Sequence, residues 1–366
     1  MKITFVVPGY ARKAIGGIRV VYCYANTLVS LGHEVSVVHA ACFRMRPSLR
    51  DGRPLAQARE LVGGVRDLAR GAPESPTWQW IDERVALDYV PTIANRHLPE
   101  ADAIVATAWQ TADPVAAADP SKGRGCYLIQ HHETWSGSAD RVDATWRLPL
   151  RRIFIAPWLY ARADAMGLDD SWRIGGAIDT ERFHVETPIE ARPRRVVMLY
   201  SQHTWKGARE GVEALVRAHE AVPDLRAVLF GTGTRPDDLP SWIEYRCDPP
   251  QRDLVDDVYN GSSVYLCPSH AEGWHLPPAE AMASGCALVS TDIDGVSEYA
   301  LDGYTALLSP VGDVGAQASN LVRLFADDDR RVELARAGHA HIQQFTWGAS
   351  TRTLVDVLAA EPILNR

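Results

Sequence analysis

The segment HAEGWHLPPAEAMASG (residues 270–285) places two glutamates eight positions apart, around a turn and the start of a helix. Pro277 and Pro278 suit a helix start, because the first N–H groups of a helix have no intrahelical partners. The pattern predicts a short helix over 279–284 that directly follows the turn at Gly273. A helix N-terminus carries partial positive charge, and a glycine lets the backbone approach a ligand closely. The segment therefore favours binding of an anion.

The two carboxylates, Glu272 and Glu280, are poorly suited to bind that anion themselves. They are better placed to accept hydrogen bonds from neutral hydroxyl groups on either side of it. A ligand with a diphosphate in the middle and a sugar at each end, which is a nucleotide sugar, fits this arrangement. The alternative is a capped helix with two surface acids and no ligand, and the physical argument alone leaves both interpretations open.

Length, composition and charge are those of a globular protein with room for two domains. The 366 residues are 46% hydrophobic and 23% charged, and the net charge of -8 argues against general nucleic-acid binding. No stretch is long and apolar enough to span a bilayer. The opening MKITFVVPGY is too short for a signal peptide and predicts a buried strand. Six scattered cysteines without a CxxC pair are typical of reduced thiols in a cytoplasmic protein.

Strand-like and helix-like segments alternate almost throughout the chain, which predicts two doubly wound α/β halves with parallel sheets. Ligands of such sheets bind outside the carboxyl ends of the strands. A glycine-containing stretch over 162–179 is predicted to be the linker between the halves. The expected strands are 3–7, 35–38, 103–107, 126–130, 196–200, 227–230, 264–267 and 287–290. The other expected helices are 20–30, 208–220 and 254–259.

The run from Glu272 to Gly285 resembles the E-x7-E signature of the retaining glycosyltransferases of family 4, which have the GT-B fold. The similarity continues through 287–308, and weaker similarities lie at Gly16-Gly17, 32–35, 176–183 and 345–347. The resemblance implies an α/β protein with two Rossmann-like doubly wound domains and an interdomain cleft. The implied parts are an acceptor-binding domain over 1–170, a nucleotide-sugar-binding domain over 171–345, and a C-terminal helix over 346–366 that crosses back to the first domain.

The resemblance also implies roles for individual residues. Glu280 would hold the ribose of the nucleotide, Glu272 would face the donor sugar, and Lys206 would neutralise the departing diphosphate. His131 would position or polarise hydroxyl groups of the donor sugar, with His132 as the alternative. The remaining residues would contact the donor through their backbone: Gly17, Cys247, Gly273, Trp274, His275 and Leu276.

One position departs from the family pattern. The family usually has an arginine five or six residues before the lysine of the Lys-Gly pair, and these positions hold Tyr200 and Ser201 here. Gln202, His203 or an arginine from another loop would have to take its place, or the donor would bind more weakly.

Together these observations predict a retaining glycosyltransferase that moves a hexose or deoxyhexose from a nucleotide-diphosphate sugar to a hydroxyl group. The acceptor would be a glycan, a lipid-linked molecule or a small molecule. No metal and no other cofactor is expected, and nucleic acid is not an expected partner. A sugar-nucleotide epimerase and a non-catalytic binding or scaffold protein on a degenerate GT-B fold stay open as alternatives.

Residues 43–71 differ from the rest of this acidic chain, because they hold seven arginines against three acidic residues. This local excess of positive charge indicates either a solvated surface or contact with an anionic acceptor or membrane. The expected location is the cytoplasm, with peripheral contact at the inner face of the membrane. This expected location would fit a role in the synthesis of a cell-surface polysaccharide or glycoconjugate.

Overall fold

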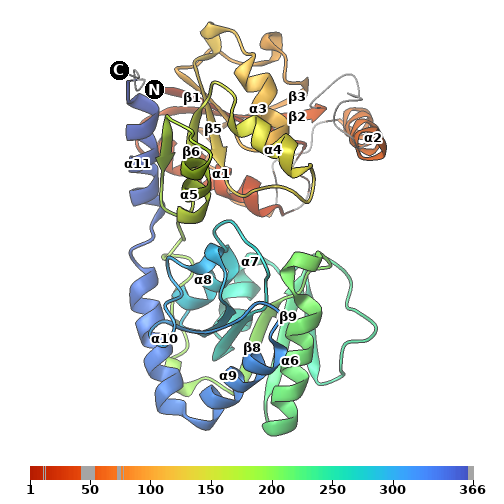
Figure 1. Ribbon diagram of the computed structural model, residues 1–366, viewed down its shortest axis with the longest axis vertical. Helices are drawn as coiled ribbons and strands as arrows, with labels where there is room; N and C mark the ends of the chain where they lie inside the picture. Colours follow the sequence, from red (N-terminus) through yellow and green to blue (C-terminus); the bar gives the residue numbers. More distant parts are fainter. Residues whose placement is uncertain (11, 13, 43–53, 72–75, 77, 362–366) are drawn as a thin grey trace. The chain divides into compact units, whose positions relative to one another are not determined.

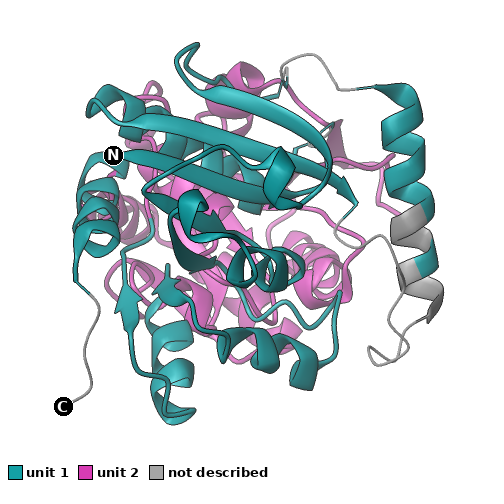
Figure 2. Ribbon diagram, turned by 90° about the horizontal axis from the view of Figure 1, so that it is seen from above, with its two compact units in different colours: residues 1–176, 347–366 teal, residues 177–346 magenta. Residues whose placement is uncertain are grey.

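The computed structural model describes residues 1–361 except 11, 13, 43–53, 72–75 and 77 (Figure 1). Within the helix α2 (Pro54–Arg70), the side chains of 54–57 and 59–61 also fall outside the description. The chain forms two compact units, residues 1–176 with 347–366 and residues 177–346 (Figure 2). Among the helices of the described residues, none combines the length and the apolar character needed to cross a membrane.

The first unit is built on a seven-stranded parallel sheet with the order β3-β2-β1-β4-β5-β6-β7. Its central strands are buried on both faces, which explains their near-continuous apolar sequences. The strands are β1 (Lys2–Pro8), β2 (Glu34–Cys42), β3 (Ala86–Thr92), β4 (Ala103–Ala106), β5 (Arg124–Ile129), β6 (Arg151–Phe154) and β7 (Ser171–Arg173). The helices are α1 (Gly16–Ser30), α2 (Pro54–Arg70), α3 (Trp109–Ala116), α4 (Ala139–Trp146), α5 (Pro157–Ala165) and α11 (Trp347–Ala359).

The last helix, α11, belongs to the first unit although 170 residues of the second unit precede it in the chain. It packs against α1, where the Tyr24 hydroxyl and Ser350 Oγ are 2.7 Å apart. The buried guanidinium of Arg151 donates to the carbonyl oxygens of Val357 (2.6 Å) and Ala360 (2.8 Å). These bonds satisfy carbonyl groups that the end of a helix leaves without partners.

The second unit has a six-stranded parallel sheet with the order β10-β9-β8-β11-β12-β13. Its core lies between the sheet and the helices α6, α9 and α10, with Leu215, Leu321 and Leu334 fully buried. The strands are β8 (Arg195–Leu199), β9 (Arg226–Gly231), β10 (Ile243–Cys247), β11 (Val264–Cys267), β12 (Ala287–Thr291) and β13 (Ala306–Ser309). The helices are α6 (Ala208–Ala221), α7 (Gln251–Asp253), the π-helical turn η6 (Leu254–Tyr259), α8 (Leu276–Ala283), α9 (Val314–Ala326) and α10 (Asp328–Ile342).

The predicted linker over 162–179 is wrong, because α5 continues to Ala165 and β7 (Ser171–Arg173) pairs with β6 in the first sheet. The first unit therefore extends to residue 176 rather than ending at 170. The strands that the sequence pattern did not reveal are β3, β6, β7, β10 and β13. Several of them are short or lie at a sheet edge, where one side is exposed and the apolar pattern is weak.

Candidate functional site

The candidate site begins at the loop between β11 and α8 in the second unit. His275 precedes the first turn of α8, and Pro277 and Pro278 lie within that turn, so the helix begins three residues earlier than predicted. The backbone N–H of His275 donates to the carbonyl of Gly295 (3.0 Å), and the buried Tyr299 hydroxyl donates to the carbonyl of His275 (2.6 Å). Contacts from the segment after β12 thus hold the loop in place.

Close packing requires glycine at two positions around this loop. A Cβ atom at Gly295 would lie 2.5 Å from the Cβ of Glu272. Gly207 has a left-handed backbone (φ 59°), and a Cβ atom there would lie 2.0 Å from the carbonyl oxygen of Pro268. The backbone N–H of His270 also donates to the carbonyl of Trp205 (2.7 Å). The loops after β8 and after β11 are therefore packed directly against each other.

This packing brings Lys206 to Glu272. Lys206 Nζ lies 2.7 Å from Glu272 Oε1 and 2.9 Å from Oε2. Glu272 is 7% exposed, so burial raises its pKa above the ordinary value, while the charge of Lys206 lowers it. The pair combines a cation that could meet a diphosphate with a carboxylate that could accept hydrogen bonds from a sugar.

The second glutamate of the segment, Glu280, is 2% exposed and lies in α8. The hydroxyl of Tyr259, on the π-helical turn η6, donates to Glu280 Oε2 (3.0 Å). The alternative of two surface acids is wrong, since Glu272 and Glu280 are both buried. A buried carboxylate is expensive unless it is compensated, which makes this pair a strong candidate for function.

Cys247 lies at the carboxyl end of β10 and is exposed. In the sheet order β9 separates β10 from β8, the strand that leads to Lys206. The next residue, Asp248, has a left-handed backbone (φ 45°), and its N–H donates to the carbonyl of Gly231 (2.6 Å). Cys247 and Lys206 thus lie at the same carboxyl edge of the sheet. Cys247 ends β10, and Lys206 follows β8, two positions away in the strand order.

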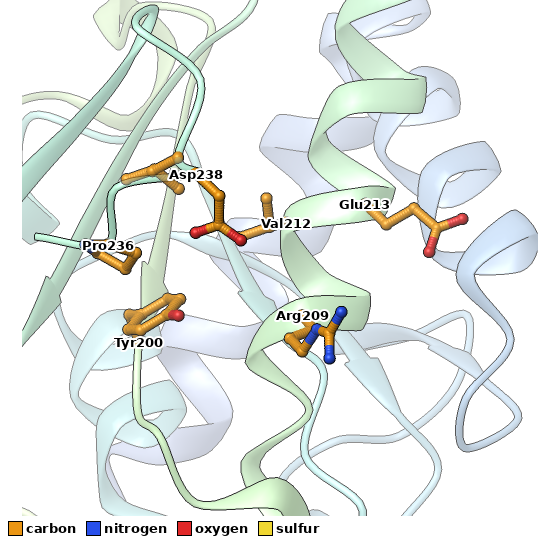
Figure 3. Close-up of a pocket in the computed structure, with 7 residues that line it drawn as sticks. Tyr200, Arg209, Val212, Glu213, Pro236 and Asp238 are labelled. Carbon is orange, nitrogen blue, oxygen red and sulfur yellow. The ribbon is translucent and has the colours of Figure 1, made fainter.

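A surface pocket opens between α6 and the segment after β9, and Asp238 points toward α6 there while Glu213 points away (Figure 3). Tyr200, which stands where the family's arginine is expected, lines this pocket together with Arg209. Arg209, three residues after Lys206, therefore lines the same pocket as Tyr200, the position where the family has its arginine. The pocket lining is Tyr200, Arg209, Val212, Glu213, Pro236, Asp238 and Leu239. With one cation and two carboxylates, this lining does not itself favour a diphosphate.

Two of the predicted residues, Gly17 and His131, lie in the first unit. Gln130, directly after β5, donates from Nε2 to the carbonyl of Gly17 in the first turn of α1 (3.1 Å), which ties this turn to the residue before His131. A Cβ atom at Gly17 would meet the Gln130 side chain at 3.5 Å, an ordinary contact distance, so space alone does not require glycine there.

The His131 ring is enclosed by tryptophans. Its centroid lies 4.6 Å from that of Trp135 and 5.7 Å from that of Trp158, both nearly perpendicular. Both ring nitrogens are shielded from solvent. His132 Nε2 instead lies 2.8 Å from Asp143 Oδ1.

The following residue, Glu133, was not among the predicted site residues. Burial raises the pKa of Glu133 to about 7, and its Oε2 accepts a hydrogen bond from the backbone N–H of Trp109 at the start of α3 (2.8 Å). Sequence reasoning also missed aromatic side chains that contact the candidate residues within each unit. In the second unit Tyr259 contacts Glu280 and Tyr299 contacts His275, and in the first unit Trp135 and Trp158 contact His131.

Part of the second unit matches a known family model. Residues 194–327 match the family model "Glycosyl transferases group 1". The match covers less than half of the chain. It contains every predicted site residue of the second unit, whereas Gly17 and His131 lie outside it.

Curated relatives include two enzymes named D-inositol 3-phosphate glycosyltransferase. The protein of Corynebacterium aurimucosum is 27% identical over 195 residues, which are 49% of this chain and 46% of the relative. The protein of Xylanimonas cellulosilytica is 31% identical over 163 residues, which are 41% and 39%. The chain thus spans about half the length, or less, of the curated relatives it matches.

Solved structures match over nearly the whole chain. HepE of Anabaena in complex with UDP has a TM-score of 0.73 at 15% identity and covers 98% of this chain and 100% of its own. Sucrose-phosphate synthase from Thermosynechococcus elongatus has a TM-score of 0.69 at 16% identity, with 97% and 98% covered. These likenesses and the two parallel sheets confirm the predicted GT-B fold with its doubly wound α/β halves.

Proposed function

We propose that this chain is a retaining glycosyltransferase that moves a hexose or deoxyhexose from a nucleotide-diphosphate sugar to a hydroxyl acceptor. The observation that carries the proposal is the ion pair between the partly exposed Lys206 and the buried Glu272 of the loop that leads into α8, with the buried Glu280 inside the helix. These groups supply one cation for a diphosphate and two carboxylates for sugar hydroxyls.

Each group has a distinct part in the proposed reaction. Lys206 and the N-terminus of α8 stabilise the negative charge that develops on the departing diphosphate. The backbone of Gly273 and Trp274, in the loop before the helix, lines the diphosphate. The N–H of His275 donates to the carbonyl of Gly295, and the two prolines have no N–H, so these three residues supply no backbone donor to the diphosphate.

The carboxylates orient the two sugars of the donor. Glu280 accepts a hydrogen bond from the ribose, and Glu272 accepts one from a hydroxyl of the donor sugar. No carboxylate is assigned as a nucleophile, so retention follows from attack on the same face, with the departing phosphate taking the proton of the acceptor hydroxyl. A bound diphosphate that is held without metal fits this scheme, because Lys206 and the helix N-terminus supply its compensating charge.

Named relatives suggest the first ligands to test. HepE and TarM of S. aureus were solved with UDP, and a starch synthase of Arabidopsis thaliana with ADP. The curated relatives are named for transfer to D-inositol 3-phosphate. We therefore place UDP and ADP first among the donor nucleotides, and a phosphorylated cyclitol among the small-molecule acceptors beside glycans and lipid-linked sugars.

The proposal is tested by thermal stabilisation with UDP, GDP, dTDP and ADP, without metal or acceptor. A nucleotide at about 100 times its Kd adds about 2.7 kcal/mol of stability to the state that binds it. The matching nucleotide sugars are then incubated with and without acceptors. Transfer only with an acceptor supports the proposal, a new nucleotide sugar without acceptor indicates an epimerase, and binding of no nucleotide supports the non-catalytic alternative.

We further propose that α2 contacts an anionic membrane surface that carries a lipid-linked acceptor. Of the arginines over 43–71, Arg44, Arg46, Arg50 and Arg53 and the side chain of Arg59 lie outside the described residues. Arg66 and Arg70 are exposed. The same helix exposes Val62 (67%), Val65 (55%) and Leu68 (42%), and a helix with both apolar and basic exposed residues suits the surface of a membrane. Such contact fits a role in making a cell-surface polysaccharide or glycoconjugate.

A further inference from the structure

A chain of buried ionisable groups extends from Lys206 behind the candidate diphosphate position. Lys206 contacts Glu272 at 2.7 Å, Glu272 Oε1 lies 3.4 Å from His275 Nε2, and His275 Nδ1 lies 3.3 Å from Cys267 Sγ. Glu272, His275 and Cys267 are 7%, 4% and 1% exposed. The side chain of His275 is therefore part of the charged site, although the sequence indicated only a role for its backbone.

The two ring nitrogens of His275 face two different groups, because Nδ1 lies beside the thiol of Cys267 and Nε2 points toward Glu272 Oε1. Burial raises the pKa of Cys267, so this neighbour stays a neutral thiol. The neutral ring that carries its hydrogen on Nε2 can donate to Glu272. A second proton can be added at Nδ1 without turning the ring, because the sulfur can accept a hydrogen bond as well as donate one.

A diphosphate at Lys206 changes the charge balance of Glu272. In one limit Lys206 moves to the diphosphate and leaves a buried carboxylate without its cation. In the other limit Lys206 bridges both groups, and new negative charge lies close to Glu272. Both changes strengthen the attraction of the Glu272–His275 pair for a proton, because each makes its surroundings more negative.

Few other ionisable groups face the Glu272–His275 pair and could compensate the added negative charge. From β11 and the segment after β12, Tyr265 and Tyr299 are neutral, since burial raises the pKa of each well above its ordinary value. Glu280 on α8 adds negative charge. In the same loop, His270 Nε2 lies 3.3 Å from Glu210 Oε1 and already has that carboxylate as its partner.

We propose that His275 replaces Lys206 as the partner of Glu272 when the donor binds, and that the Glu272–His275 pair takes up one proton from solvent in that step. The inference rests on the proposed function, because it needs a diphosphate at Lys206. Glu272 thereby stays able to accept a hydrogen bond from the donor sugar while Lys206 serves the diphosphate. His275 is a positioning residue that acts through Glu272.

The test is calorimetric titration of the full chain at pH 8 with the nucleoside diphosphate that stabilises it most among UDP, GDP, dTDP and ADP. HEPES and Tris are compared, because their ionisation enthalpies differ and the observed heat then reports the protons exchanged. At pH 8 the free nucleotide is fully ionised, so any proton that is taken up on binding is taken up by the protein. We expect uptake of about one proton per nucleotide, and a Kd that rises by up to about tenfold per pH unit above neutrality.

Variants assign the proton to its site. His275→Gln keeps an N–H group near Glu272 but cannot titrate, so proton uptake should disappear while the nucleotide still binds. His270→Gln is the matched control, because it changes a histidine of the same loop that is paired with Glu210 instead of Glu272, and uptake should persist. The wild-type comparison of buffers does not depend on any variant folding.

The outcomes separate the inference from the proposed function. Nucleotide binding with the same heat in both buffers overturns proton uptake and leaves the proposed function intact. Undiminished uptake in His275→Gln overturns the role of His275. If no nucleotide binds to the wild-type chain, the proposed function fails and the inference fails with it.

Discussion

Replacing Lys206 with methionine should destabilise the second unit in a way that depends on pH. Methionine keeps most of the apolar length of the lysine side chain and removes its charge. Glu272, which is 7% exposed, then has no ammonium group at 2.7 Å. A buried carboxylate in this position will take up a proton rather than stay charged.

The need for that proton limits the size of the effect. The ordinary pKa of a glutamate is 4.5, and each pH unit above it adds about 1.36 kcal/mol to the free energy of protonation. Protonating Glu272 therefore costs about 3.4 kcal/mol at pH 7 and about 0.7 kcal/mol at pH 5. The loss of stability in Lys206→Met should stay below the first value at neutral pH and below the second in mild acid, because the raised pKa of Glu272 already costs the wild-type chain part of each.

The sign follows from the direction of the pKa shift. Burial raises the folded-state pKa of Glu272 above the unfolded value even beside Lys206, so its contribution to stability is complete below pH 4.5 and declines as the pH rises. Without Lys206 the folded pKa rises further and the decline continues to higher pH. The difference between the two chains should therefore widen from pH 5 to pH 7.

The assay is urea unfolding of the full chain at pH 5 and pH 7, for wild type, Lys206→Met, Glu272→Gln and the double variant. Glu272→Gln has no titrating group at this position, so adding Lys206→Met to it should have the same effect at both pH values. The reasoning would be refuted if Lys206→Met, in the chain that keeps Glu272, lowered the free energy of unfolding equally at pH 5 and pH 7.

The remaining predictions concern both units. Glu280→Ala should weaken nucleotide binding by about 1–3 kcal/mol, because a buried hydrogen-bonding partner is lost; unchanged thermal stabilisation by the nucleotide would contradict the ribose assignment. Gly207→Ala should destabilise the fold and displace Lys206, since φ is 59° and the new Cβ would meet the Pro268 carbonyl, and urea unfolding with nucleotide titration measures both effects. Arg151→Met should lower the free energy of unfolding by about 1–3 kcal/mol, because the carbonyl of Val357 loses its partner while that of Ala360 keeps Arg124, and denaturation can measure this loss. Joint substitution of Arg66 and Arg70 by glutamate should reduce sedimentation with anionic liposomes and leave nucleotide affinity unchanged; equal sedimentation would count against the membrane contact.

Local patterns were sufficient for the elements that carry the candidate site. Alternating strands and helices predicted two doubly wound halves, because a buried parallel strand and an amphipathic helix each leave a periodic signal within a few residues. The segment from Glu272 to Gly285 predicted a turn and a short helix, since glycine and proline restrict the backbone locally. Strands such as β7 and β10 have no comparable signal, because they are short or lie at a sheet edge.

Tertiary structure alone decided how the candidate residues are surrounded. Lys206 and Glu272 are 66 residues apart, and they meet because β8 and β11 are neighbours in the sheet and their following loops pack together. The burial of Glu280 depends on Tyr259, and the enclosure of His131 depends on Trp158, which follows a different strand. The sequence by itself determined which residue types stand at the strand ends. The order of strands in the sheet determined which of them became partners, and burial then set their charge and access.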